Sequence, residues 1–136
     1  MQNQMSLKVK KLVKLWAPPV FWMALIFFLS SRPTLKTTQI YWQDFIIKKT
    51  AHFIEYAILA FLYLRGFLGS GFPKKKSFIF ALVLCILYAA SDEFHQSFIP
   101  GREPRIRDVI IDTIGAFSSL YYFVFYRKKP FKYLQS

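Results

Sequence analysis

The chain has 136 residues, of which 54% are hydrophobic and 20% aromatic, and its formal net charge is +12. Its apolar residues form long blocks with almost no polar face, and a chain this short is too small to hide four such helices, which excludes a soluble helical bundle. The lysines and arginines flank these blocks without any nucleic-acid motif, so the expected partners are the lipid bilayer and its anionic head groups, not nucleic acid.

The apolar blocks follow one another along the chain, and a bilayer span needs roughly 20 residues. The pattern therefore predicts an all-α integral membrane bundle of four transmembrane helices in a single domain, residues 1–136. The predicted spans cover about 15–31, 50–70, 77–94 and 108–126.

The segments between the spans carry their own signals. Pro18 and Pro19 are expected in the first turns of the first span, where proline is tolerated. Residues 34–47 are expected to form an outer loop whose aromatic centre suits a membrane interface. Residues 97–107 contain Pro100-Gly101 and Pro104, and could form a re-entrant loop between the third and fourth spans.

Charge is distributed unevenly between the two sides of this bundle. Twelve basic residues fall on the side of the termini: Lys8, Lys10, Lys11, Lys14, Arg65, Lys74, Lys75, Lys76, Arg127, Lys128, Lys129 and Lys132. Seven fall on the other side: Arg32, Lys36, Lys48, Lys49, Arg102, Arg105 and Arg107. The positive-inside rule then puts both termini in the cytoplasm. All seven acids lie in or near the outer half.

Polar residues at helical spacing mark the outer ends of three spans. They are His52, Glu55 and Tyr56 on the second span, Asp92, His95 and Gln96 on the third, and Asp108 and Asp112 on the fourth. A charge at mid-bilayer costs roughly 2.5 to 3.5 kcal/mol. We therefore expect these faces to point at one another, with an arginine of the last outer loop closing over the carboxylates.

Several chemistries suit such a set, and ion pairing that merely holds the helices together is an alternative for each residue. A divalent metal would take its ligands from His52, Glu55, Asp92 and Asp108. Acid–base catalysis would use His52, Glu55, Asp92 and Glu93. Plain binding of a phosphate or carboxylate is the third chemistry. The expected ligand-binding residues are Lys49, His52, Glu55, Tyr56, Asp92, Glu93, His95, Gln96, Arg102, Asp108 and Asp112.

The chain resembles the VanZ-like family at these same residues. Residues 28–33, 49–56, 91–102 and 108–115 are close to the family motifs F-L-S-S-x-P, K-x-x-H-F-x-E-Y, S-D-E-x-H-Q-x-F-x-P-G-R and D-x-x-x-[ND]-x-x-G. The resemblance implies a bacterial plasma-membrane protein of the cell envelope. The family takes its name from a protein that gives low-level resistance to the glycopeptide teicoplanin, and it supplies no established reaction. Asp112 stands where the family often has asparagine, which argues against an obligatory carboxylate there.

Three hypotheses about function follow from the residues and the resemblance. The first is a membrane factor whose outer polar pocket binds an anionic lipid-linked or cell-wall-related ligand and contributes to teicoplanin resistance. The second is an intramembrane hydrolase or transferase, in one version metal-dependent, that acts on a lipid head group. The third is a structural helper that packs against a larger envelope complex.

Overall fold

Four long helices make up almost all of the protein in its computed structural model, which describes residues 2–32, 41–100, 102 and 105–127. The helices are α1 (Gln2–Ser30), α2 (Tyr41–Gly69), α3 (Lys74–Gln96) and α4 (Ile106–Tyr121), and a π-helical turn (Tyr122–Tyr126) continues α4. No strand occurs in these residues. Each helix, α4 with its π-helical turn, contains a segment long and apolar enough to cross a membrane. The prediction of an all-α, four-span membrane bundle is confirmed.

Two sequence-based boundaries are wrong. Residues 41–47 were predicted as loop but form the first turns of α2, since this segment holds no glycine or proline that would stop the helix; residues 34–40 lie outside the described part. Pro18 and Pro19 sit deep inside α1, because the lysine-rich and glutamine-rich residues before them extend the helix back to Gln2. Membrane helices tolerate internal proline when neighbouring groups satisfy the freed carbonyls.

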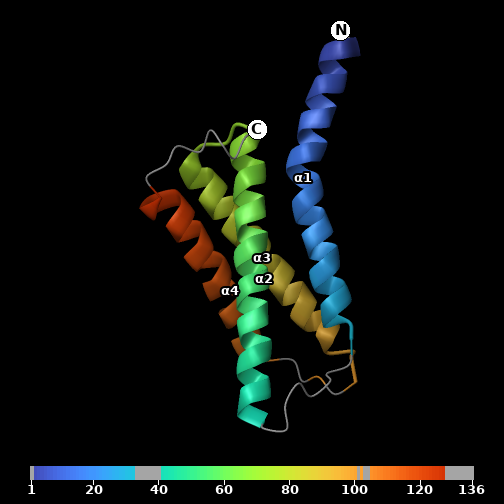
Figure 1. Ribbon diagram of the computed structural model, residues 1–136, viewed down its shortest axis with the longest axis vertical. Helices are drawn as coiled ribbons and strands as arrows, with labels where there is room; N and C mark the ends of the chain where they lie inside the picture. The colour runs from blue at the N-terminus through green and yellow to red at the C-terminus, as the bar shows by residue number, and fades with distance from the viewer. Residues whose placement is uncertain (1, 33–40, 101, 103–104, 128–136) are drawn as a thin grey trace.

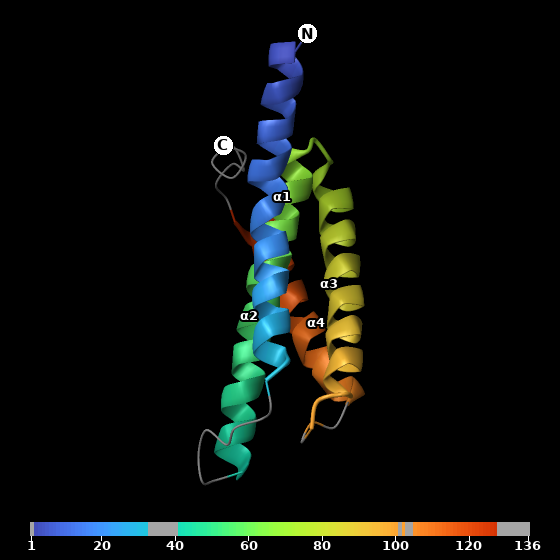
Figure 2. The ribbon, with the colours of Figure 1, turned by 90° about the vertical axis from the view of Figure 1, so that its right-hand side faces the viewer.

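The helix α2 is the centre of the bundle and contacts each of the other three (Figure 1). Its most extensive contact is with α4, and α3 packs against both of them. The first helix leans on α2, touches α3 near one end, and extends its N-terminal part beyond the rest of the bundle (Figure 2).

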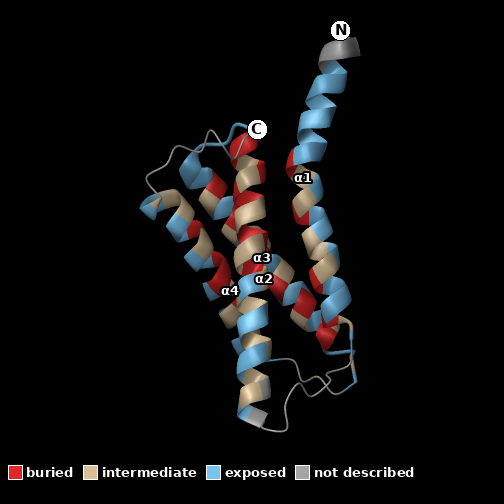
Figure 3. Cartoon of the chain, viewed as in Figure 1, coloured by how far each residue is buried: buried red, intermediate tan, exposed pale blue. Residues whose placement is uncertain are grey.

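Buried positions on α2 and α3 recur at helical spacing. On α2 they include Tyr56, Leu59, Ala60 and Leu64. On α3 small residues dominate the inward face, where the side chains are Ser77, Ala81, Cys85 and Ala89. Small residues allow membrane helices to pack closely, and large apolar side chains of α3 such as Ile79 and Leu87 are exposed. The exposed outer faces and the buried seams are visible in Figure 3.

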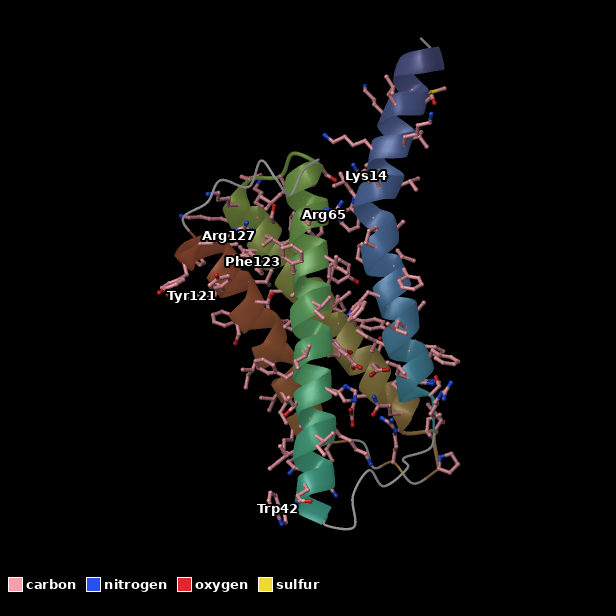
Figure 4. All side chains as sticks on the ribbon, viewed as in Figure 1. Lys14, Trp42, Arg65, Tyr121, Phe123 and Arg127 are labelled. Atoms are coloured by element: carbon pink, nitrogen blue, oxygen red, sulfur yellow. The ribbon has the colours of Figure 1, made fainter. Side chains whose placement is uncertain are left out.

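The two ends of the bundle differ in charge. Lys14, Arg65 and Arg127 lie toward one end, and Trp42 lies at the other (Figure 4). The second end, which we call the outer end, holds the C-termini of α1 and α3 and the N-termini of α2 and α4. This arrangement agrees with the predicted topology. The loop predicted to re-enter the membrane includes Gly101, Glu103 and Pro104, which lie outside the described residues, so that expectation stays a prediction.

Glycine allows α4 to approach α2 closely near the outer end. A Cβ atom on Gly115 would collide with the carbonyl oxygen of Phe53 and lie 3.1 Å from its carbonyl carbon. The neighbouring backbone has little room to move, because both residues lie in helices. This contact sets the distance between the polar faces of α2 and α4.

We predict that Gly115→Ala destabilises the bundle by about 1–3 kcal/mol, because the added methyl group forces α4 away from α2. Gly66→Ala is the matched control, since its Cβ would meet the ring of Trp16 at an ordinary 3.4 Å. Alanine also favours the helix by up to about 1 kcal/mol over glycine. Thermal unfolding in detergent micelles measures both variants. Equal midpoints for the two variants would contradict the close-contact interpretation.

Candidate functional site

Asp92, near the end of α3, is the most fully satisfied acid of the site. Its Oδ1 accepts a hydrogen bond of 2.6 Å from the Ser30 hydroxyl on α1, and its Oδ2 accepts one of 2.7 Å from the Gln96 amide. The Gln96 Oε1 in turn accepts a 2.6 Å hydrogen bond from Arg102 Nη1. Asp92 is only 3% exposed, so neutral donors from the protein replace the water that this carboxyl group would otherwise bind.

His95 and Glu93 lie beside this network but serve other contacts. The Ser31 hydroxyl lies 3.0 Å from His95 Nε2, and the His95 ring packs on Phe27 with centroids 4.4 Å apart. Glu93 Oε1 accepts a 2.6 Å hydrogen bond from the backbone N–H of Arg105, the residue that precedes α4. A carboxylate suits the positive end of a helix. These two predicted site residues therefore join α3 to α1 and to α4.

Lys49 and Asp108 form the outermost contact between α2 and α4. Lys49 Nζ lies 2.5 Å from Asp108 Oδ2, and the half-exposed Arg107 places its Nε 3.7 Å from the other oxygen. The guanidinium of Arg107 also lies 4.6 Å from the ring centre of Phe45. Lys49, predicted to bind an anionic ligand, is thus already engaged by a carboxylate of the protein.

His52 lies one turn deeper, between two carboxyl groups. Its Nδ1 is 3.8 Å from Glu55 Oε2 on the same helix and 3.8 Å from Asp112 Oδ1 on α4. Both distances are too long for a hydrogen bond. The nitrogen is buried and has no hydrogen-bond partner. This contact exists because Gly115, one turn beyond Asp112, brings α4 against the backbone of α2.

Three buried polar atoms near these groups lack a hydrogen-bond partner. They are His52 Nδ1, the Tyr56 hydroxyl and Arg102 Nε. Most buried polar atoms in folded proteins have a hydrogen-bond partner. The three unpaired atoms therefore mark this region as a candidate ligand-binding site. Asp108 Oδ1 is also without a hydrogen bond, although Arg107 lies near it.

The Asp92 network and the His52 group belong to one site. Asp92 and Arg102 lie close enough to interact electrostatically with both His52 and Glu55, and Tyr56 interacts in the same way with Asp92 and Asp112. We call this set the outer polar site, and its members are His52, Glu55, Tyr56, Asp92, Gln96, Arg102 and Asp112. All seven are among the residues that the sequence predicts to bind a ligand, whereas the predicted residues Lys49, Glu93, His95 and Asp108 lie around the edge of this set.

The predicted metal ligands do not assemble into a metal-binding group. Among the described residues, no three histidine, cysteine or acidic side chains gather in a way that could hold a metal ion. Asp92 bonds to Ser30 and Gln96, and Asp108 pairs with Lys49, so each is turned toward a different partner. This geometry favours hydrogen bonding over metal ligation as the chemistry of the site.

Two contacting residues were missed from the sequence. Ser30 and Ser31 end α1 and reach Asp92 and His95 of α3, respectively. The signal was a pair of hydroxyl residues closing an otherwise apolar block. Trp22, also on α1, donates its indole N–H to the Glu55 carbonyl at 2.9 Å. The first span therefore helps to shape a site that was expected to involve only the other three.

Comparison with known proteins gives one result that bears on this arrangement. A family model described as VanZ/LLP1 matches residues 14–127, which covers most of the chain and every residue of the outer polar site. No curated protein and no solved structure matches the chain.

Replacing Ser30 by alanine should destabilise the protein by about 1–3 kcal/mol, because Asp92 Oδ1 would lose its donor inside the bundle. Ser91→Ala is the control: this exposed hydroxyl donates only to the Tyr88 carbonyl of its own helix, and its loss should cost less than about 0.5 kcal/mol. Unfolding temperatures in detergent compare the two. If Ser30→Ala and Ser91→Ala unfold alike, the Ser30–Asp92 contact is not a significant tie between α1 and α3.

Proposed function

Because the chain belongs to the VanZ/LLP1 family, we propose that it is a multi-pass protein of the bacterial plasma membrane whose outer polar site binds an anionic group. The bound group is the phosphate or carboxylate of a lipid-linked or cell-wall-related molecule. Through this binding the protein contributes to resistance against lipophilic glycopeptides such as teicoplanin. The positive-inside rule puts the site on the outer face, where such molecules are used.

Arg102 carries this proposal. Among the described residues its guanidinium forms no ion pair with a carboxylate; it donates Nη1 to the neutral Gln96 amide and leaves Nε buried without a partner. A guanidinium offers several N–H donors in a planar fork that matches phosphate and carboxylate oxygens. Lys49 is already paired with Asp108, whereas Arg102, the arginine among the seven residues of the outer polar site, has donors left for a ligand.

The surroundings of Arg102 favour a ligand at the membrane boundary. Gln96 holds the arginine in place, and Asp92 holds Gln96, so the binding group is fixed before a ligand arrives. Preorganisation of this kind reduces the ordering cost of binding. The site lies where α3 ends and α4 begins, which lets a head group reach it while the acyl or isoprenyl chain stays in the bilayer.

We expect Arg102→Gln to weaken binding of a short-chain phosphatidylglycerol by about tenfold to hundredfold, the loss of one or two charge-assisted hydrogen bonds. Arg107→Gln removes the same charge from a half-exposed side chain that stacks on Phe45, so it should change the affinity by less than about threefold. Titration calorimetry in detergent supplies the dissociation constants. Unchanged affinity in Arg102→Gln would exclude this arginine as the anion-binding group.

A bacterium that lacks this protein should become more susceptible to teicoplanin. Expression of the unaltered chain or of Arg107→Gln should restore the original susceptibility, whereas Arg102→Gln should not. The minimum inhibitory concentration measures the effect, with membrane abundance of each variant checked by immunoblot. If the deletion strain and its parent are equally susceptible, the protein has no role in resistance.

A further inference from the structure

A guanidinium and two carboxyl groups lie near one another in the outer polar site without pairing. Within the described residues, Arg102 has no carboxylate partner, and neither Glu55 nor Asp112 has a lysine or arginine partner. Arg102 is nevertheless within electrostatic reach of Glu55. Buried charges of opposite sign ordinarily pair, because each left alone loses its hydration without compensation.

The fold keeps these charges apart. Arg102 is held by Gln96 and, through it, by Asp92 at the end of α3. Glu55 and Asp112 are held on α2 and α4, on either side of His52, at the contact that Gly115 permits. The site therefore has a cationic part and an acidic part, each anchored to different helices.

Tyr56 adds a second unpaired polar group to this end of the site. Its side chain is completely buried, at 0% exposure, yet its hydroxyl has no hydrogen-bond partner. The hydroxyl is within electrostatic reach of Asp92 and Asp112. A tyrosine oxygen without a partner is an acceptor suited to a cationic N–H donor.

We propose that the ligand is zwitterionic and carries a primary ammonium group beside its phosphate, as in a phosphoethanolamine head group. This inference rests on the proposed function, because it keeps the phosphate on Arg102. The ammonium group lies against Glu55, Asp112 and the Tyr56 hydroxyl, whose oxygens accept its three N–H donors. The phosphate then pairs with Arg102, and the ammonium group gives Glu55 and Asp112 the N–H donors that they lack in the protein.

Chemistry of the head group follows from this arrangement. A choline group has a positive charge but no N–H donor, so it would leave the three acceptors without hydrogen bonds. A glycerol group has donors but no positive charge to offer the two carboxyl groups. Ethanolamine has both, and its ligand adds no net charge to a site at the membrane boundary.

The test compares short-chain phosphatidylethanolamine, phosphatidylcholine and phosphatidylglycerol as probes, with the full chain in detergent. We expect phosphatidylethanolamine to bind at least about tenfold more tightly than the other two, the value of one charge-assisted hydrogen bond. Glu55→Gln and Asp112→Asn should remove the preference. Glu93→Gln should keep it, because this control removes an acidic charge at the same end while its amide oxygen still accepts the Arg105 N–H.

The preference is a ratio measured within one variant, so a smaller folded fraction in Glu55→Gln or Asp112→Asn does not change it. Soluble O-phosphoethanolamine identifies the source: competition means that the head group alone suffices, and its failure to compete means that the lipid chains are needed. If phosphatidylethanolamine and phosphatidylglycerol bind equally tightly and both depend on Arg102, the proposal of a zwitterionic ligand is wrong. The proposed function would still hold. Arg102-independent binding of every probe would overturn both.

Discussion

A carboxyl group within a membrane bundle must find its hydrogen-bond donors inside the protein, and this constraint organises the outer end of the molecule. Asp92 meets it by taking one donor from α1 and one from its own helix. Through Gln96 the same network reaches the loop before α4. Because bulk water is excluded, Asp92 takes its donors from the protein and so connects α1, α3 and the loop before α4.

On α3 the outward and inward faces differ in side-chain size. Large apolar side chains face outward on all four helices, where lipid tails receive them, and small residues line the inner face of α3. Gly115 has no side chain, so α4 approaches the backbone of Phe53 closely and the polar faces of α2 and α4 come together. Small residues at the helix contacts therefore allow both the close packing and the approach of the polar groups.

The outer polar site contains groups whose hydrogen bonds are satisfied and groups that have no hydrogen-bond partner. Asp92, Gln96 and Ser30 satisfy one another and form a rigid support. Against that support, Arg102 Nε, His52 Nδ1 and the Tyr56 hydroxyl remain without partners. The first set explains how the helices are held, and the second set is why we propose a ligand. Arg102 links the two sets, because it donates Nη1 to the Gln96 amide oxygen and has further N–H donors for a ligand.

The sequence by itself determined the helical class and the four spans, and its helical spacing predicted that polar residues gather at the outer end. Hydrophobic block length and helical spacing carry that information locally. The predicted start of α2 was wrong because residues 41–47 hold no glycine or proline to mark a boundary. The predicted place of Pro18 and Pro19 was wrong because the residues before them extend α1 back to Gln2.

Partner choice was decided only by the tertiary structure. Spacing alone put Lys49 and Arg102 in the same class, yet the approach of α2 to α4 pairs Lys49 with Asp108 and leaves Arg102 on Gln96. Spacing likewise grouped the metal candidates that the fold turns toward separate partners. Helical spacing also did not predict the hydrogen bond from Ser30 to Asp92. Such pairings depend on how helices cross, and crossing is fixed by packing between segments distant in the chain, such as the fit of Gly115 on Phe53.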